Sequence, residues 1–429
     1  MFKAVDKWLP GYLKSLLSRP RPAIGTRHLI IGLCDHYEPF RDGADVATAR
    51  QTVNDWLAAY PASVDGFRDA DGRPPRHTFF YPQEEYDEAI LDRLAAFCRQ
   101  GHGEVEIHLH HRHDTPEGLR GKLVTFRDLL HNQHGLLGET LARSEVYEPV
   151  EKLVAAADKR WPHMSRPTLS KIHALAGAAT ERNPYGLKSN VPSSPVRYAF
   201  IHGNWSLCNS RPDGDWCGVN EELGILAETG CYADFTFPSA PSPTQPRMVN
   251  AIYYASDTPG RPRGADRGRR LSVIGYRLLG KKPNNQEPIT NNGAEGALML
   301  ITGPLALNWR RRKWGVLPRF ENADLCGSNP PTAERIRLWA DQRIGVAGRP
   351  DWVFVKLHTH GCMPQNARVL FGEAMRRMHE VLQAEYNDGH AWQLHYVTAR
   401  EMFNLVKAAE ANLPGPPGQY RDTPILWKA

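Results

Sequence analysis

Short apolar runs alternate with longer stretches of helical periodicity along the first part of the chain. Arg27 to Asp35 is a continuous apolar run that ends in polar residues, as in a strand buried on both faces. Positions 47–60 have helical spacing, Arg76 to Tyr81 has the pattern of a second strand, and positions 84–99 carry an apolar helical stripe. This alternation predicts parallel strands with helices packed outside them.

The segment 104–115, EVEIHLHHRHDT, joins a strand pattern to a run of histidines. Its apolar residues alternate with polar ones, so His108 and His110 would leave the sheet on the same side. Four of the chain's 18 histidines lie within six positions here, and Asp114 follows them where the strand would pass into a loop. Because divalent transition metals select imidazole beside carboxylate, the segment predicts a metal site. A merely polar sheet end or an adventitious cluster is the alternative.

The alternation continues less regularly along the rest of the chain. Positions 197–201 have a strand pattern that runs into His202, and positions 351–357 have another that runs into HTHGC. The region 240–295 is rich in Pro, Gly, Asn and Arg and is predicted to be mostly loop. Strands are also expected over 231–239, 297–301 and 392–397, and helices from Thr115 onward and over 146–160, 168–181, 220–230 and 368–385.

Several predicted strands end in side chains that bind metals or carry protons. In parallel α/β proteins, ligands collect at the carboxyl ends of the strands. These side chains, distant in the sequence, are therefore expected to converge. They are Asp35 and His36, the run from His108 to Asp114, His202 and Asn204, and His358 and His360.

The composition fits a soluble globular protein, because 41% of the 429 residues are hydrophobic and 23% are charged. No apolar run approaches the length of roughly eighteen residues that a membrane span needs. The basic N-terminus lacks the apolar core of a signal peptide, so a helix packed on the domain is expected there, with a membrane-surface helix as the alternative. Seven scattered cysteines without a CxxC pair indicate no disulfide framework, and a cytoplasmic location is expected.

The net charge of +6 comes partly from two basic clusters, Arg261 to Arg270 and Arg310 to Lys313. Such clusters suit phosphate, acidic sugar, nucleic acid or an anionic membrane. The first is rich in Gly and Pro and is expected to be a solvated loop. Nucleic-acid binding is not expected, because the clusters lack interleaved aromatic residues and a recognisable module.

In order along the chain, these motifs resemble those of the polysaccharide deacetylases with the NodB homology fold. CDH at 34–36 takes the place of the family's Asp-Asp pair. GEVEIHLHHRHD at 103–114 takes the place of its metal motif, with His110 on the first metal histidine and Asp114, in place of histidine, four residues later. KLHTH at 356–360 matches the family's late Leu-x-His motif.

The resemblance covers most of residues 25 to 400 and implies a distorted (β/α) barrel of about seven parallel strands with long loop insertions. The segment 217–238 is similar to the family's third region, but the arginine and Pro-Tyr of that region are absent. The expected organisation is a basic helical segment over 1–25, one barrel-like domain over 26–412 with an insertion at about 240–295, and a Pro-rich tail over 413–429.

The resemblance also implies one divalent metal ion (Zn, Mn, Co or Ni) that polarises an acetamide carbonyl and lowers the pKa of a water. Asp35 would take the proton of that water, and His358 would donate a proton to the leaving amine. Which of Asp35 and His36 touches the metal stays open. The metal ligands would come from His36, His108, His110 and Asp114, and the substrate contacts from His202, Asn204, Trp205 and His360.

Two departures from the family pattern affect the expected chemistry. Asp114 in place of a histidine adds negative charge beside the metal, which favours harder ions such as Mn or Mg. The missing arginine removes a group that would orient the catalytic carboxylate. The sequence therefore also predicts an activity that is lower than, or different from, that of the family.

The expected function is a metal-dependent hydrolase that removes acyl groups, N-acetyl groups in particular, from a carbohydrate in polysaccharide metabolism. Association with enzymes of glycan synthesis is a further expectation. A metallo-phosphoesterase or amidohydrolase with two metal ions is the first alternative, because two His-x-His pairs occur, at 108/110 and 358/360. The second alternative is a barrel that binds a glycan or a partner protein without catalysis.

Overall fold

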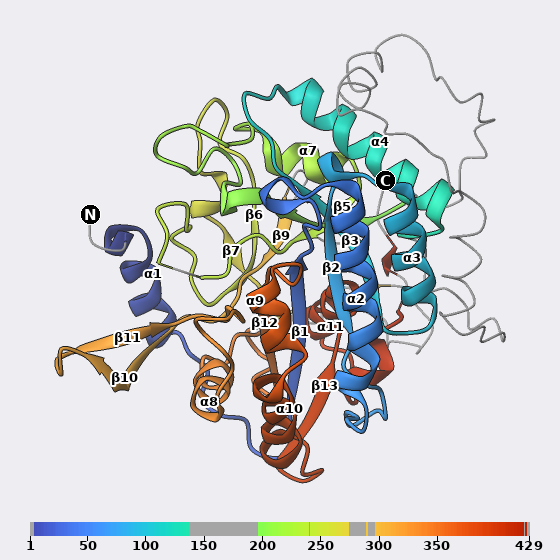
Figure 1. Ribbon diagram of the computed structural model, residues 1–429. Helices are drawn as coiled ribbons and strands as arrows, with labels where there is room; N and C mark the ends of the chain where they lie inside the picture. Colours follow the sequence, from blue (N-terminus) through green and yellow to red (C-terminus); the bar gives the residue numbers. More distant parts are fainter. Residues whose placement is uncertain are drawn as a thin grey trace.

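The structure is a computed structural model, and it describes residues 4–137, 196–239, 241–273, 289–290, 297–423 and 425–426. The chain has a mixed α/β fold in which helices pack around a large, mostly parallel sheet (Figure 1). The helical segments predicted over 146–160 and 168–181 lie outside the described residues. No helix in the described part of the chain is long and apolar enough to cross a membrane.

Ten strands of the described chain form one sheet, in the order β12-β1-β2-β3-β4-β5-β9-β6-β7, with β13 also paired to β1. The pairings from β12 to β9 are parallel, whereas β6 and β7 are added antiparallel. The pairings among the described strands do not close the sheet into a barrel, since β9 and β12 are not paired. The strands are β1 (Arg27–His36), β2 (His77–Pro82), β3 (Gly103–Leu109), β4 (Tyr198–His202), β5 (Cys231–Asp234), β6 (Ile252–Ala255), β7 (Arg269–Arg270), β9 (Leu298–Ile301), β12 (Trp352–Thr359) and β13 (Trp392–Tyr396).

The helices begin where the sequence supplies capping side chains. Asp45 accepts a hydrogen bond from the backbone of Thr48 at the start of α2, and Thr115 accepts one from Gly118 at the start of α4. Asp87 caps α3, which therefore begins at Glu88 and not at the predicted position 84. The helices are α1 (Val5–Leu17), α2 (Val46–Val64), α3 (Glu88–Arg99), α4 (Pro116–His134), α7 (Glu222–Glu228), α8 (Ala333–Asp341), α9 (Pro364–Leu370), α10 (Glu373–Tyr386) and α11 (Ala399–Glu410).

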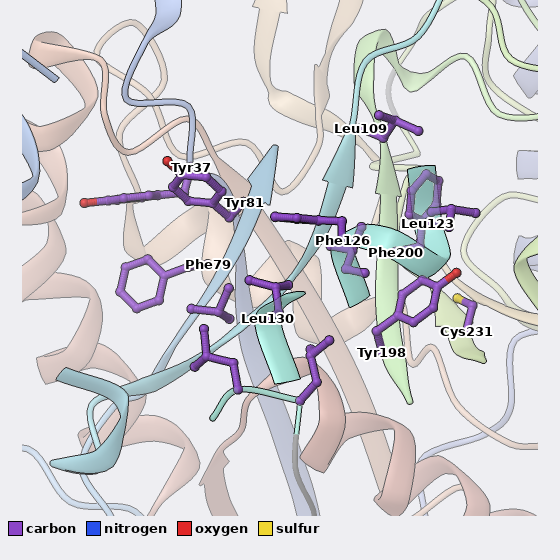
Figure 2. Close-up of a cluster of buried hydrophobic side chains, with 14 of the residues drawn as sticks. Tyr37, Phe79, Tyr81, Leu109, Leu123, Phe126, Leu130, Tyr198, Phe200 and Cys231 are labelled. Carbon is purple, nitrogen blue, oxygen red and sulfur yellow. The ribbon is translucent and has the colours of Figure 1, made fainter. Parts of the chain in front are cut away.

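Apolar side chains fill the space between the sheet and its helices. One cluster lies between α2, α3 and α4 and the strands β2 to β5, and Figure 2 shows part of it, with Phe79 and Phe200 from the strands and Phe126 from α4. A second cluster joins the opposite faces of the strands to α11, through residues such as Met402 and Phe403. Because helices cover the sheet, its strands are buried along nearly their whole length.

Several elements differ from the sequence prediction. The helix expected over 368–385 is two helices, α9 and α10, which break at Gly372. A Cβ atom on Gly372 would lie 2.4 Å from the carbonyl oxygen of Arg368, so the close approach of the two helices requires glycine there. The described part of the region 240–295 is mostly loop, as expected, and also contains the short strands β6 and β7. The short pairs β10 (Ala306–Lys313) with β11 (Leu317–Glu321) and β8 (Ile289–Thr290) with β14 (Ile425–Leu426) were not predicted.

The N-terminal helix α1 packs on the rest of the described chain, as expected. Its Trp8 and Tyr12 are buried in a small cluster with Val249 and Leu305. Gly11 lies against the backbone there, because a Cβ atom on it would lie 1.9 Å from the carbonyl oxygen of Arg247. The face of α1 that carries Trp8 is therefore part of the core.

Candidate metal centre

Glu38 lies at the centre of a group of histidines, two residues beyond the end of β1. His108 Nε2 is 3.2 Å and His110 Nε2 is 3.4 Å from Glu38 Oε1. His36 and His360 also offer ligand atoms close enough to Glu38 to share one ion with it, and the rings of His36 and His360 stack with centroids 4.6 Å apart. We call these five residues the Glu38 set.

In two of these histidines, a hydrogen bond made by Nδ1 determines the tautomer. In the neutral ring, Nε2 then carries the lone pair and faces Glu38. His108 Nδ1 lies 2.7 Å from the carbonyl oxygen of Ile201, which can only accept, so Nδ1 carries the hydrogen. His110 Nδ1 lies 2.6 Å from Glu84 Oε1 and is fixed in the same way. In their neutral forms both imidazoles therefore direct an Nε2 lone pair at a carboxylate oxygen. A cation between them would match all three donor atoms.

Burial sets the charge of the groups in the Glu38 set. Burial lowers the pKa of His36 well below its usual value, helped by the neighbouring His360 and His108, and His36 Nε2 is buried without a hydrogen-bond partner. Burial alone would raise the pKa of Glu38, but the hydrogen bond and charge of His108 outweigh it and lower the pKa to about 2. Arg41 binds the other carboxylate oxygen of Glu38, Oε2. Burial alone would lower the pKa of His110, but its hydrogen bond to Glu84 and the nearby carboxylates outweigh burial and raise that pKa. A metal ion would therefore compete with protons on these histidines, because imidazole binds a metal in its neutral form.

A second group repeats this layout next to the first. His111 Nε2 lies 3.2 Å and His202 Nε2 lies 3.5 Å from Glu222 Oε1. His111 Nδ1 is held by Asp114 Oδ2 at 2.9 Å, and His202 Nδ1 donates to the carbonyl oxygen of Gly203 at 2.5 Å. We call His111, His202 and Glu222 the Glu222 set. Since His110 and His111 are consecutive, the two sets are neighbours.

The two histidines of the Glu222 set have opposite pKa shifts. Burial alone would lower the pKa of His111, but its hydrogen bonds to Asp114 and Glu222 outweigh burial and raise the pKa to about 9. Burial lowers the pKa of His202 to about 4, and its Nε2 is buried without a hydrogen-bond partner. Without a metal ion the set therefore holds one positive charge, the proton on His111, which an ion bound among the three side chains would displace.

The spacing of the donor atoms fits a small ion in both sets. A tetrahedral site with bonds of roughly 2.0 to 2.1 Å separates its donor atoms by about 3.3 Å. The four Nε2 to carboxylate distances, 3.2 and 3.4 Å at Glu38 and 3.2 and 3.5 Å at Glu222, agree with that separation. Imidazole and carboxylate donors suit zinc, cobalt and nickel.

Two glycines give the rings the space that they occupy. A Cβ atom on Gly203 would lie 2.0 Å from Cδ2 of His110, and a Cβ atom on Gly218 would lie 2.6 Å from Glu222 Oε2 and 2.7 Å from Nε2 of His111. Any other residue at either position would push a candidate ligand from its place.

A cavity of about 1200 Å³ opens onto both sets. Charged side chains of both signs and two tryptophans line it, so it offers hydrogen bonds and aromatic faces to a polar ligand. The lining residues include His36, Glu38, Arg41, Glu84, Glu85, His110, His111, Arg112, Lys122, Asn204, Trp205, Arg211, Trp216 and His360.

Seven of the ten sequence-predicted site residues belong to the two sets or line this cavity. His36, His108 and His110, predicted as metal ligands, are in the Glu38 set. His360, predicted to contact substrate, joins the same set, and His202 joins the Glu222 set. Asn204 and Trp205, also predicted to contact substrate, line the cavity. The convergence follows from the parallel sheet, which brings the carboxyl ends of β1, β3, β4 and β12 together.

Asp114 lies outside the Glu38 set. Its Oδ2 accepts hydrogen bonds from His111 Nδ1 at 2.9 Å and from Lys122 Nζ at 2.8 Å. Asp114 thus orients His111, and the structure does not bring it together with His110 in one ligand group among the described residues.

The two residues predicted to be catalytic lie in different surroundings. Asp35 is fully buried, and its carboxylate accepts hydrogen bonds from His77 Nε2 at 2.9 Å and from the backbone of Gly361 at 2.6 Å. Asp35 is not among the residues that line the cavity. His358 is also buried, with its Nε2 3.7 Å from Asp324 Oδ1 and its ring edge-on to Trp205.

The sequence prediction missed the carboxylates at the centres of the two sets. Glu38 could have been found, because it follows His36 by two positions where the strand ends, so both can face the same side. Glu84 and Glu222 lie in stretches that were interpreted only as helices, and nothing in their local pattern distinguishes them from solvent-exposed residues.

No protein-family model matches the sequence, and no curated protein matches it. The function is therefore argued from the chemistry of the two sets and the cavity.

Proposed function

We propose that the protein is a metal-dependent hydrolase that removes acyl groups, N-acetyl groups in particular, from a carbohydrate. The observation that carries this proposal is the Glu38 set, in which four imidazoles offer ligand atoms around one carboxylate beside a large polar cavity. The run β12-β1-β2-β3-β4-β5-β9 contains seven strands, the number in the barrel that the resemblance implied. We include that distorted deacetylase-type barrel in the proposal.

His108, His110 and Glu38 would hold the metal ion, with His36 and His360 as further ligands. A divalent ion there supplies a Lewis acid that polarises a carbonyl oxygen and lowers the pKa of water. Glu84 holds the ring of His110 through Nδ1, and Ile201 holds that of His108. Because both rings are held by hydrogen bonds, their donor atoms are preorganised.

The proton transfers need a base and an acid in the cavity. The catalytic role that the resemblance implied for Asp35 stays a prediction, but Glu85 lies in the cavity wall and is better placed. Burial and the charge of Glu38 raise the pKa of Glu85 to about 8, so it exchanges a proton near neutral pH. The role of proton donor to the leaving amine that the resemblance implied for His358 stays a prediction too, because His358 does not line the cavity and burial lowers its pKa well below the usual value.

The cavity favours a sugar-like substrate. Its volume of about 1200 Å³ is at or above the upper end of the range of small-molecule sites. Trp205 and Trp216 both line it, and an indole face packs well against the apolar face of a sugar ring. Arginines at its rim, Arg41 and Arg112 among them, suit a substrate that also carries negative charge.

The first test is the metal content of purified protein. We expect bound transition metal in the wild type, and loss of one ion per chain in Glu38→Gln and in His110→Ala. His113→Asn is the matched control, because His113 lies in the same histidine run but is exposed and belongs to neither set. A wild type that holds no metal and gains none on titration with zinc, manganese, cobalt or nickel contradicts the proposal.

The second test is acetate release from a panel of N-acetylated sugars and oligosaccharides. We expect the metal-loaded wild type to release acetate, and His358→Ala to lose about 10²- to 10⁴-fold in kcat while retaining its metal. Glu85→Gln should lose activity to a similar extent. If His358→Ala retains full activity, the assignment of His358 as the acid is wrong.

A second candidate function is a hydrolase with two metal ions, acting on phosphate esters or on amides. The Glu222 set favours it, because a second His-Glu-His group with the same spacing adjoins the first. Two ions per chain, one lost in His202→Ala and the other in Glu38→Gln, would support this candidate. Hydrolysis of phosphate monoesters and diesters should then be assayed beside acetate release.

A further inference from the structure

The exposed large apolar side chains gather in one part of the described chain. All of them except Trp216 lie in residues 13–24 or in the hairpin formed by β10 and β11. In the hairpin, Trp309 is 56% exposed, Trp314 is 71% exposed and Val316 is 67% exposed. A soluble domain rarely exposes several such side chains together without a partner.

The same hairpin carries a dense positive charge. Four consecutive basic residues, 310–313, lie between the two tryptophans, and Arg319 follows on β11. The stretch 306–320 contains no acidic residue, and Glu321 after it is buried. The cations lie beside the indoles, with Lys313 Nζ 4.4 Å from the ring centre of Trp314. We call residues 309–317 the hairpin tip.

The hairpin is held firmly at its base and projects from the body of the protein (Figure 1). Phe320 packs edge-on against Trp8 of α1, with ring centres 5.1 Å apart, and the backbone of Leu307 donates to the hydroxyl of Tyr12. The turn places Trp314 and Gly315 at positive φ, an uncommon conformation for tryptophan. The base of the hairpin is therefore part of the core, and the exposed side chains of the hairpin tip can contact another surface.

We propose that the hairpin tip docks the protein on the surface of an anionic lipid bilayer. The apolar side chains would enter the headgroup region, where tryptophan is favoured, and the basic residues would pair with lipid phosphates and carboxylates. The exposed Leu13, Leu16 and Leu17 of α1, which packs on the hairpin base, supply additional apolar surface nearby. The protein would bind at the surface of the bilayer without crossing it.

The combination of side chains distinguishes a bilayer from other polyanions. Nucleic acid and acidic glycans would use the arginines but gain little from Val316 and Leu317, which lie exposed at the turn. A bilayer uses both, because apolar insertion and electrostatic attraction act on the same tip. The proposal does not depend on the identity of the reaction in the cavity.

The test is co-sedimentation of the full chain with vesicles of phosphatidylcholine, with and without phosphatidylserine. We expect the wild type to bind only the vesicles that contain phosphatidylserine. The double variant Trp309→Ala, Trp314→Ala should bind more than roughly tenfold more weakly, because buried indole surface is lost. The double variant Arg310→Gln, Arg311→Gln should bind about 25-fold more weakly, at about fivefold for each charge.

Trp216→Ala is the matched control, because Trp216 is an exposed tryptophan outside the hairpin, and its vesicle binding should equal that of the wild type. Binding to heparin or single-stranded DNA is measured in parallel and should be unchanged in the tryptophan variant. Failure of the wild type to bind anionic vesicles overturns the proposal. So does vesicle binding that the tryptophan variant retains, or a hairpin-dependent association of two chains in the absence of vesicles.

Discussion

Two groups of histidine and carboxylate side chains have similar composition but opposite electrostatics. In the Glu38 set, the Nε2 atoms of His108 and His110 lie 3.2 and 3.4 Å from one carboxylate oxygen, Oε1 of Glu38. In the second group, His395 Nδ1 lies 2.9 Å from Asp71 Oδ2, and Asp69 and Asp71 both bind the buried guanidinium of Arg421. We call Asp69, Asp71, His395 and Arg421 the Arg421 group.

The difference shows what separates a structural ion network from a metal site. Both groups offer three donor atoms within 4.8 Å of one another. In the Arg421 group the protein supplies the cation, with Arg421 Nη2 2.6 Å from Asp69 Oδ2. At Glu38, Arg41 binds only Oε2, and the histidines around Oε1 leave a place that a metal ion fits. Whether a side chain of the protein or a bound ion supplies the positive charge therefore distinguishes the two groups better than the types of their ligand atoms do.

The largest effect is expected from a substitution that removes the internal cation. Arg421→Met should lower the free energy of unfolding by about 3–5 kcal/mol, because it leaves two carboxylates without their buried partner. Urea denaturation measures this change. Arg120→Met is the control, since its ion pair with Glu228 is exposed and should contribute less than about 1 kcal/mol. An equally small effect for Arg421→Met would mean that the Arg421 group is not held by its guanidinium.

The next effect is the stabilisation by a metal ion bound beside Oε1 of Glu38. Zinc at about a hundredfold excess over its dissociation constant should raise the free energy of unfolding of the wild type by about 2.7 kcal/mol. The gain should fall in Glu38→Gln and persist in Asp71→Asn. Thermal denaturation with and without zinc measures both. A gain that depends on Asp71 would show that zinc binds in the Arg421 group and not in the Glu38 set.

The smallest expected effect concerns the proton on His111 in metal-free protein. Its pKa in the folded state, about 9, lies above the usual value of 6.5, so its stabilisation is present in full below pH 6.5 and is lost as the pH rises through 9. Between about pH 6.5 and 8.5 the wild type should lose about 2 kcal/mol more of its free energy of unfolding than His111→Asn does.

Urea denaturation of both proteins at several pH values gives this difference. Zinc bound in the Glu222 set should remove the difference, because the ion replaces the proton. Parallel pH profiles for the two metal-free proteins would show that His111 is neutral in the folded state.

Much of the fold could be predicted from the sequence where each strand is a short apolar run between polar ends. Arg27–His36 and Trp352–Thr359 are strands of this kind, and His36 at the end of the first meets His360 just beyond the second, as parallel strands require. The helix α11 was missed because it carries buried polar residues, such as Lys407 and Glu410, which pair with each other at 2.6 Å. Periodicity cannot show that a polar residue is buried with a partner.

The candidate site was predicted in part, for a similar reason. Histidines are rare enough for a cluster to be noticed, whereas glutamates are common on surfaces, so Glu38 and Glu222 were missed. Asp114 was assigned to the metal by its spacing from His110, but the start of α4 places it beside His111 and Lys122. Beyond the end of a strand, the spacing of residues along the chain does not determine which way their side chains point.

The contact of Gly203 with His110 has a consequence for the inheritance of this gene. Every amino-acid replacement at codon 203 adds at least one carbon atom, which would lie 2.0 Å from the ring of His110. We expect selection to remove all of these replacements while the position of the His110 ring matters. Only silent changes should accumulate at that codon, and a population survey of the gene would show the position as invariant glycine.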